Sequence, residues 1–173
     1  MQAVKIILGS ILAATGYGIV HDQITARIYI EYFTISHPKL IDSDSPTVLG
    51  LFWGIAATWW VGLFLGCILS ICARVGSRPK LSLEELIHPI KTLLIVSFSL
   101  AIIAGHIGFL TNSSGTFGLV EPLKSRIPES KHPGFLIVTW AQSASYLSVF
   151  IGGIILCVST WRRRGKLTRA QLP

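Results

Sequence analysis

Residues 47–73 read TVLGLFWGIAATWWVGLFLGCILSICA and contain no charged side chain. This run exceeds the ~20 apolar residues that a helix needs to cross the hydrocarbon core of a bilayer. Over the whole chain, 51% of residues are hydrophobic, 13% are charged and the mean hydropathy is +0.62. This balance suits a lipid solvent, so we predict that residues 47–73 span a membrane.

Small side chains recur at every fourth position along the same run, which places them on one helix face. In lipid, such faces let two helix backbones approach closely. We predict that this face is the main packing surface of a bundle within the chain, with a homodimer contact as the alternative. The predicted packing residues are Gly50, Gly54, Thr58, Gly62, Gly66 and Ser70.

Three further apolar runs cover residues 4–24, 90–110 and 135–161. The first has the shortest apolar core, the 15 residues from Ile6 to Val20, but it lacks a good signal-peptidase site, so we expect it to remain as a helix. The sequence therefore predicts an all-α membrane protein, a single domain over residues 1–173 with four transmembrane helices. Its outer loops would be 25–46 and 111–134, and its inner loop 74–89.

The direction of the spans follows from the basic residues, because Lys and Arg near span ends are retained in the cytoplasm. With the N-terminus inside, ten lie inside, namely Lys5, Arg74, Arg78, Lys80, Lys91, Arg162, Arg163, Arg164, Lys166 and Arg169. Five lie outside, namely Arg27, Lys39, Lys124, Arg126 and Lys131. Both termini are therefore predicted to be cytoplasmic, and the basic inner face to rest on anionic lipid headgroups. Because the charges flank apolar runs, the net charge of +7 does not indicate nucleic acid binding.

Local patterns give smaller expectations. Ser82 to Glu85 has the form of a capping box, which predicts a short amphipathic helix over residues 81–87 at the inner interface. Proline at a first helical position explains His88-Pro89. We expect the indole groups of Trp59 and Trp60, in the middle of a span, to find polar partners inside the bundle. The cysteines, which form no CxxC pair, are expected to be packing residues, namely Cys67, Cys72 and Cys157.

The stretch YGIVHDQITAR at residues 17–27, followed by EYFT at 31–34 and HP at 37–38, resembles a signature of small uncharacterised bacterial integral membrane proteins. Ser45-Pro46-Thr47 and the tryptophan-rich residues 53–62 resemble a second block of the same family. The resemblance covers about the first 60 residues. It implies a four-helix protein of the bacterial inner membrane, and it carries over no catalytic residue.

Polar groups that could do chemistry gather at the outer membrane level. The predicted span interiors contain no Asp, Glu, Lys or Arg, which disfavours an ion-coupled transporter. The catalytic candidates are His21, Asp22, Glu31 and His106, and the metal-binding candidates are His21, His37, His106 and His132. A structural network is the preferred interpretation, with an ion pair from Arg27 to Glu31 one turn apart, unless residues 25–35 form a strand. The sequon Asn112-Ser113-Ser114 is a common chance pattern.

We further expect His21, Asp22 and His106 to meet near the outer surface. All three lie near the outer ends of outward-running helices, and His106 adjoins Gly105 on a small-residue stripe, which favours an inward direction.

Three functions remain open at this point. The preferred one is a non-enzymatic membrane component that binds lipid or a membrane protein partner and needs no cofactor. The second is an outward-facing metal, haem or acid–base site of a membrane-embedded hydrolase or redox protein. The third is a passive carrier of a small neutral solute.

Overall fold

The computed structural model describes residues 1–113 and 118–170, and these form helices without any β-strand among them. Four helical segments are long and apolar enough to cross a membrane. This confirms the expected all-α class with four candidate spans. They are α1 (Gln2–Ile28), α3 with α4 (Pro46–Ala56 and Trp59–Arg74), α5 (Leu83–Ser113) and α7 (His132–Ala170). Short helices lie in the connections, namely α2 (Glu31–Ile35), α6 (Leu123–Arg126) and the 3-10 turn η1 (Glu129–Lys131).

Residues 25–28 and 31–35 are helical, so the alternative of a strand over residues 25–35 is wrong. Tyr29 ends α1 in an extended conformation, and the chain turns directly into α2. The sequon that begins at Asn112 is not fully covered by the described residues.

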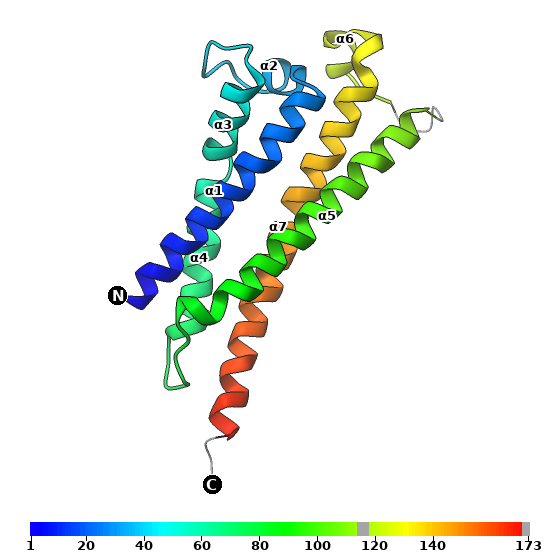
Figure 1. The fold of residues 1–173 in the computed structure, drawn as a ribbon. Coiled ribbons are helices and arrows are strands. Elements are labelled where there is room, and N and C mark those ends of the chain that lie inside the picture. Colours follow the sequence, from blue (N-terminus) through cyan, green and yellow to red (C-terminus); the bar gives the residue numbers. More distant parts are fainter. Residues whose placement is uncertain (114–117, 171–173) are drawn as a thin grey trace.

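The spans pack as two pairs. α1 lies along α3 and α4, and α5 lies across α7, while contacts from α4 to α7 and from α1 to α5 join the pairs (Figure 1). Large apolar side chains cover the outside of every span, for example Leu12, Phe64, Ile102 and Ile155. This outward distribution is expected where lipid is the solvent.

The stripe of small residues on α3 and α4 faces α1 along its length. A Cβ atom added at Gly54 would lie 2.6 Å from the Cα of Ile19, and one added at Gly62 would lie 2.7 Å from the Cα of Ile11. Gly18 of α1 lies directly opposite Gly54, and a Cβ atom added at Gly18 would collide with the Gly54 carbonyl oxygen. The other members of the stripe contact α1 as well, namely Gly50 at Asp22, Thr58 at Gly18, Gly66 at Ser10, and Ser70, whose hydroxyl donates to the Ala3 carbonyl at 3.4 Å.

The second span is interrupted at its middle. α3 ends at Ala56 and α4 begins at Trp59, and the Thr58 hydroxyl donates to the Gly54 carbonyl across the break. Trp59 and Trp60 follow the break and are 47% and 54% exposed. The expectation that they turn into the bundle is therefore wrong, because the inward face at this point belongs to the small residues against α1.

The short interfacial helix expected over residues 81–87 is not a separate element. Leu83 begins α5, which continues through Pro89, so this proline is not at a first helical position. Proline lacks the N–H that would bond the Glu85 carbonyl one turn earlier. Arg163 of α7 donates to that carbonyl at 3.2 Å and so replaces the missing bond. Ser82 N donates to Glu85 Oε2 at 2.9 Å, which is one bond of the expected capping box.

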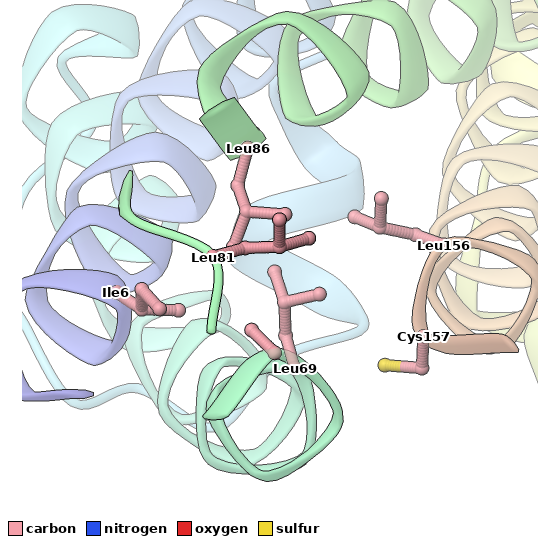
Figure 2. Packing of buried hydrophobic residues seen from close by; sticks show 7 residues of the cluster. Ile6, Leu69, Leu81, Leu86, Leu156 and Cys157 are labelled. Carbon is pink, nitrogen blue, oxygen red and sulfur yellow. The ribbon is translucent and has the colours of Figure 1, made fainter. Parts of the chain in front are cut away.

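The half of the bundle that holds the start of α1 and the end of α4 has an apolar core, to which five segments contribute (Figure 2). Leu81 of the connector and Leu86 of α5 lie 1% exposed between the other helices. The remaining buried members come from α1, α4 and α7, namely Ile6, Leu69, Ala73, Leu156 and Cys157.

Arg164 lies beside this core and is fully buried. Its guanidinium donates to main-chain carbonyl oxygens only, those of Cys72 at 2.8 Å, Val75 at 3.0 Å, Arg78 at 2.9 Å and Pro79 at 2.7 Å. The last carbonyls of a helix lack partners within the helix, so this one side chain caps the end of α4 and holds the connector against α7. The sequence indicates Arg164 only as one of ten basic residues that orient the spans, and it does not indicate that this side chain is buried.

Candidate functional site

A buried polar cluster joins α1 to α7 in the half of the bundle that holds the end of α1 and the start of α7. Asp22 is 5% exposed, and its Oδ1 accepts a hydrogen bond from Gln142 Nε2 at 2.8 Å. His21 is 4% exposed, with Nδ1 3.3 Å from the same carboxylate oxygen. Since an ionised carboxylate can only accept, it fixes the proton of the His21 ring on Nδ1 and leaves Nε2 as an acceptor.

Tyr17 extends the cluster by one turn toward the centre of the bundle. Its hydroxyl lies 2.8 Å from Ser145 Oγ, and its ring stacks on the His21 ring with centroids 5.8 Å apart. Thr25 donates to the His21 carbonyl at 3.2 Å and contacts Gln142 at 3.5 Å. Two polar links, Asp22 with Gln142 and Tyr17 with Ser145, therefore connect α1 and α7.

Sequence reasoning missed the α7 side of this cluster. Gln142 is the single carboxamide of residues 135–161, and Ser145 follows it by three residues, so the two share a helix face. A lone carboxamide within an apolar span signals an interhelical hydrogen bond, and this signal was available.

His106 does not join the His21–Asp22 pair directly. Its side chain lies on an exposed face of α5 and contacts the Phe109 ring at 6.5 Å between centroids, so the expected inward direction is wrong. His106 and His21 nevertheless line the same cavity, of about 350 Å³, between α1, α5 and α7. The Gly105 side of α5 faces α7, which turns the next residue outward.

The other three candidates have separate partners. Glu31 pairs with Lys131 at the start of α7. His37 Nδ1 lies 3.0 Å from the Tyr32 carbonyl oxygen, and its ring packs on Trp53 with centroids 4.5 Å apart. His132 Nε2 lies 2.8 Å from the Ile127 carbonyl oxygen. In the part of the chain that the structure describes, no three His, Cys, Asp or Glu side chains are grouped closely enough to hold a metal ion.

The expected pair of Arg27 and Glu31 is not formed. Arg27 Nη1 donates to Gln23 at 2.6 Å, and its Nη2 donates to Thr47 Oγ1 at 2.7 Å, so it joins α1 to the start of α3. The helix ends at Ile28, which turns Glu31 away from Arg27 and toward α7.

Two ionisable groups of α2 have shifted pKa values. Burial acts to raise the pKa of Glu31, but the hydrogen bond and the charge of Lys131, with a main-chain hydrogen bond, bring it below the usual value. Burial, and then the negative charge of Asp22, raises the pKa of Tyr32 to about 12. Tyr32 is therefore neutral at physiological pH, and Glu31 is ionised.

Comparisons with known proteins do not add a relative. No protein-family model matches this chain, and no curated protein or solved structure does.

Proposed function

We propose that this chain is a multi-pass component of a bacterial inner membrane, with both termini in the cytoplasm, that acts by binding lipid and neighbouring membrane proteins. The resemblance of residues 17–62 to bacterial membrane proteins and the distribution of basic residues support the membrane and the orientation. No catalytic step is assigned to it.

The observation that carries this proposal is the basic inner end of α7. The helix has 39 residues, or roughly 58 Å at ~1.5 Å per residue, which exceeds the ~30 Å hydrocarbon core. Its final turns beyond Trp161 therefore stand outside the hydrocarbon core. Arg162, Lys166 and Arg169 are exposed on these turns, where they can contact anionic headgroups.

Few acidic side chains balance this end of the bundle. Glu84 and Glu85 are the carboxylates of residues 74–91, and Glu85 is already paired with Arg163 at 3.3 Å. The end of the bundle with the start of α1, the 75–82 connector and the end of α7 (Figure 1) therefore keeps an excess of positive charge.

Retention of lipid by the purified full chain tests the proposal. After detergent extraction from vesicles that contain phosphatidylglycerol and phosphatidylcholine, native mass spectrometry counts the lipids that remain bound. The wild type should retain phosphatidylglycerol preferentially, and the triple variant Arg162→Gln, Lys166→Gln, Arg169→Gln should lose this preference. The matched control removes three exposed charges of the opposite end, Lys39→Gln, Lys124→Gln and Arg126→Gln. Equal retention by all three proteins would contradict the proposal.

One observation favours a second candidate, an acid–base, metal or haem site at the outer level. A buried carboxylate fixes the imidazole of His21, and the free ring nitrogen belongs to a side chain that lines a cavity. Carboxylate-oriented histidines have this form in metal sites and in proton transfer. Visible absorption and metal content of the purified chain test the metal and haem versions. Either signal, lost in His21→Gln, supports them, and a colourless, metal-free protein rejects them.

A further inference from the structure

The cavity between α1, α5 and α7 is a largely apolar space that three polar residues line, namely His21, Thr25 and His106. Its volume of about 350 Å³ falls in the lower part of the range of small-molecule sites, ~300–1,000 Å³. Aromatic and aliphatic side chains form most of its walls, chiefly Ile24, Ile28, Phe98, Ile102, Phe109 and Ile137.

Thr25 already donates to the His21 carbonyl, and the other two polar residues are imidazoles from different helices. The His21 ring uses Nδ1 toward Asp22, and within residues 1–113 and 118–170 no side chain or main-chain group bonds its Nε2. His106 likewise makes no hydrogen bond within that part of the chain. The cavity therefore contains ring nitrogens that the described protein leaves unsatisfied.

Neither of these ring nitrogens lies at the end of its helix. His21 lies seven residues before the end of α1, and His106 seven residues before the end of α5. At ~1.5 Å per residue, each ring lies roughly 10 Å inside its helix end. A ring nitrogen that faces hydrocarbon without a partner is unfavourable. A ligand with matching polar groups would remove this cost.

We propose that the cavity binds a membrane-soluble quinol: a flat ring with hydroxyl groups and an apolar tail. Phe98 and Phe109 line the cavity and offer aromatic surface against which such a ring can pack. Because Asp22 fixes the His21 proton on Nδ1, Nε2 accepts a hydrogen bond from one ring hydroxyl, and His106 can bond the other. The tail leaves past Ile24 and Ile102, which are 44% and 60% exposed. This inference concerns binding alone and does not rest on the basic end of α7.

Thermal unfolding of the purified full chain in detergent tests the site, because a ligand that binds only the folded state raises the Tm with concentration. Decylubiquinol, kept reduced under anaerobic conditions, is the probe. Decylbenzene has the same tail without polar groups, and decylubiquinone has carbonyls in place of hydroxyls. We expect a saturable rise of Tm with decylubiquinol, a weaker one with decylubiquinone and none with decylbenzene. Absence of a rise with decylubiquinol, or an equal rise with either of the other compounds, overturns the proposal.

Single variants locate the binding. His106→Phe removes an exposed imidazole, and the decylubiquinol concentration for half the effect should increase about five- to tenfold, as for one lost hydrogen bond. His21→Phe should abolish the effect. The matched control is His88→Phe, which changes another exposed histidine of α5 that does not line the cavity, and it should behave as the wild type. An unchanged response in His106→Phe overturns the proposed site, whatever happens to the folding of His21→Phe.

Discussion

Asp22 illustrates how a single residue is tolerated inside an apolar bundle. A carboxylate removed from water is costly unless hydrogen bonds replace its hydration. The Gln142 amide and the His21 ring supply them, and both are themselves buried. In return the carboxylate ties α1 to α7, two helices that otherwise touch little.

This link can be measured by a double-mutant cycle. Asp22→Ala and Gln142→Ala should each destabilise the protein, and the double variant by less than their sum. We expect a coupling free energy of about 0.5–2 kcal/mol, the range of hydrogen bonds between membrane helices. Chemical unfolding in mixed micelles provides the four free energies. The control cycle pairs Asp22→Ala with Thr139→Ala, whose hydroxyl bonds within α7, and its coupling should be near zero. Equal couplings in the two cycles would contradict the assigned hydrogen bond.

Arg164 is a single side chain whose removal should have a large effect on stability. Arg164→Ala leaves four main-chain carbonyl oxygens without their donor, so we expect a loss of unfolding free energy on the order of 3 kcal/mol. The Tm of the detergent-solubilised protein measures the loss. Arg162→Ala, an exposed arginine two residues away, is the matched control and should change the Tm little. Similar shifts in the two variants would show that charge, and not the capping of α4, is responsible.

At the scale of elements, close approach of backbones decides which helices pair. The four-residue spacing of small side chains was visible in the sequence, but spacing does not name the partner helix. The partner is α1 because Gly18 and Ser10 present small groups opposite Gly54 and Gly66. Two stripes are complementary only if their small residues lie at the same height along the bundle. The sequence of one stripe alone does not give this relative height.

Gly18→Val tests this contact. The added side chain would collide with the Gly54 carbonyl and the Thr58 side chain, so α1 and α3 must separate. We expect a loss on the order of 3 kcal/mol of unfolding free energy, at the upper end of overpacking effects. Gly16→Val, two residues earlier on the same helix, meets no neighbour within 4 Å and should be nearly neutral. Equal destabilisation by both variants would indicate an effect of glycine itself and not of the interface.

A second pairing of elements, between α2 and the start of α7, depends on pH. Because the folded pKa of Glu31 lies below its unfolded value, the pair with Lys131 stabilises the protein above the unfolded pKa and loses its effect as pH falls through the folded one. Lys131→Gln should therefore lower the Tm near pH 7, and this effect should shrink and vanish as the pH falls through the folded pKa of Glu31. The change is at most about 1 kcal/mol, because the Lys131 side chain is half exposed. Lys124→Gln is the control, and a pH-independent effect of Lys131→Gln would contradict the ion pair.

The sequence predicts the helices themselves better than it predicts which helices and side chains contact one another. Apolar length alone places the four helices, since lipid leaves few other options for the backbone. The local sequence favours a helix start at Pro89, whereas α5 continues through it. The donor that replaces the missing N–H of Pro89 is Arg163, which lies 74 residues away in the chain. His106 was expected inside because its neighbour Gly105 is small, yet adjacent helical residues point about 100° apart. Each error concerns a tertiary contact and not a local pattern.

At the scale of the whole molecule, the two ends of the bundle differ in charge. One end carries the start of α1, the 75–82 connector and the end of α7, and the other carries α2 and α6 (Figure 1). Six of the eight acidic residues fall in or next to the second end, namely Asp22, Glu31, Asp42, Asp44, Glu121 and Glu129. Ten of the fifteen basic residues belong to the first. Such an asymmetry favours retention of the first end in the cytoplasm during insertion, which is the orientation proposed above.

Reporter fusions test the orientation directly. A reporter active only in the cytoplasm, fused after Pro173, should be active because the five basic residues of 162–169 hold this end inside. The same reporter placed after Asp44 or after Ser125 should be silent, and a periplasmic reporter should give the opposite pattern at all three positions. Changing Arg162, Arg163, Lys166 and Arg169 to Gln provides a control on the cause. If the positive charges set the direction, the signals at Pro173 should become mixed in this variant, while Arg164 still caps α4. Cytoplasmic activity at Asp44 in the unaltered chain would overturn the arrangement. Four spans with both termini in the cytoplasm require the loop that contains Asp44 to lie outside.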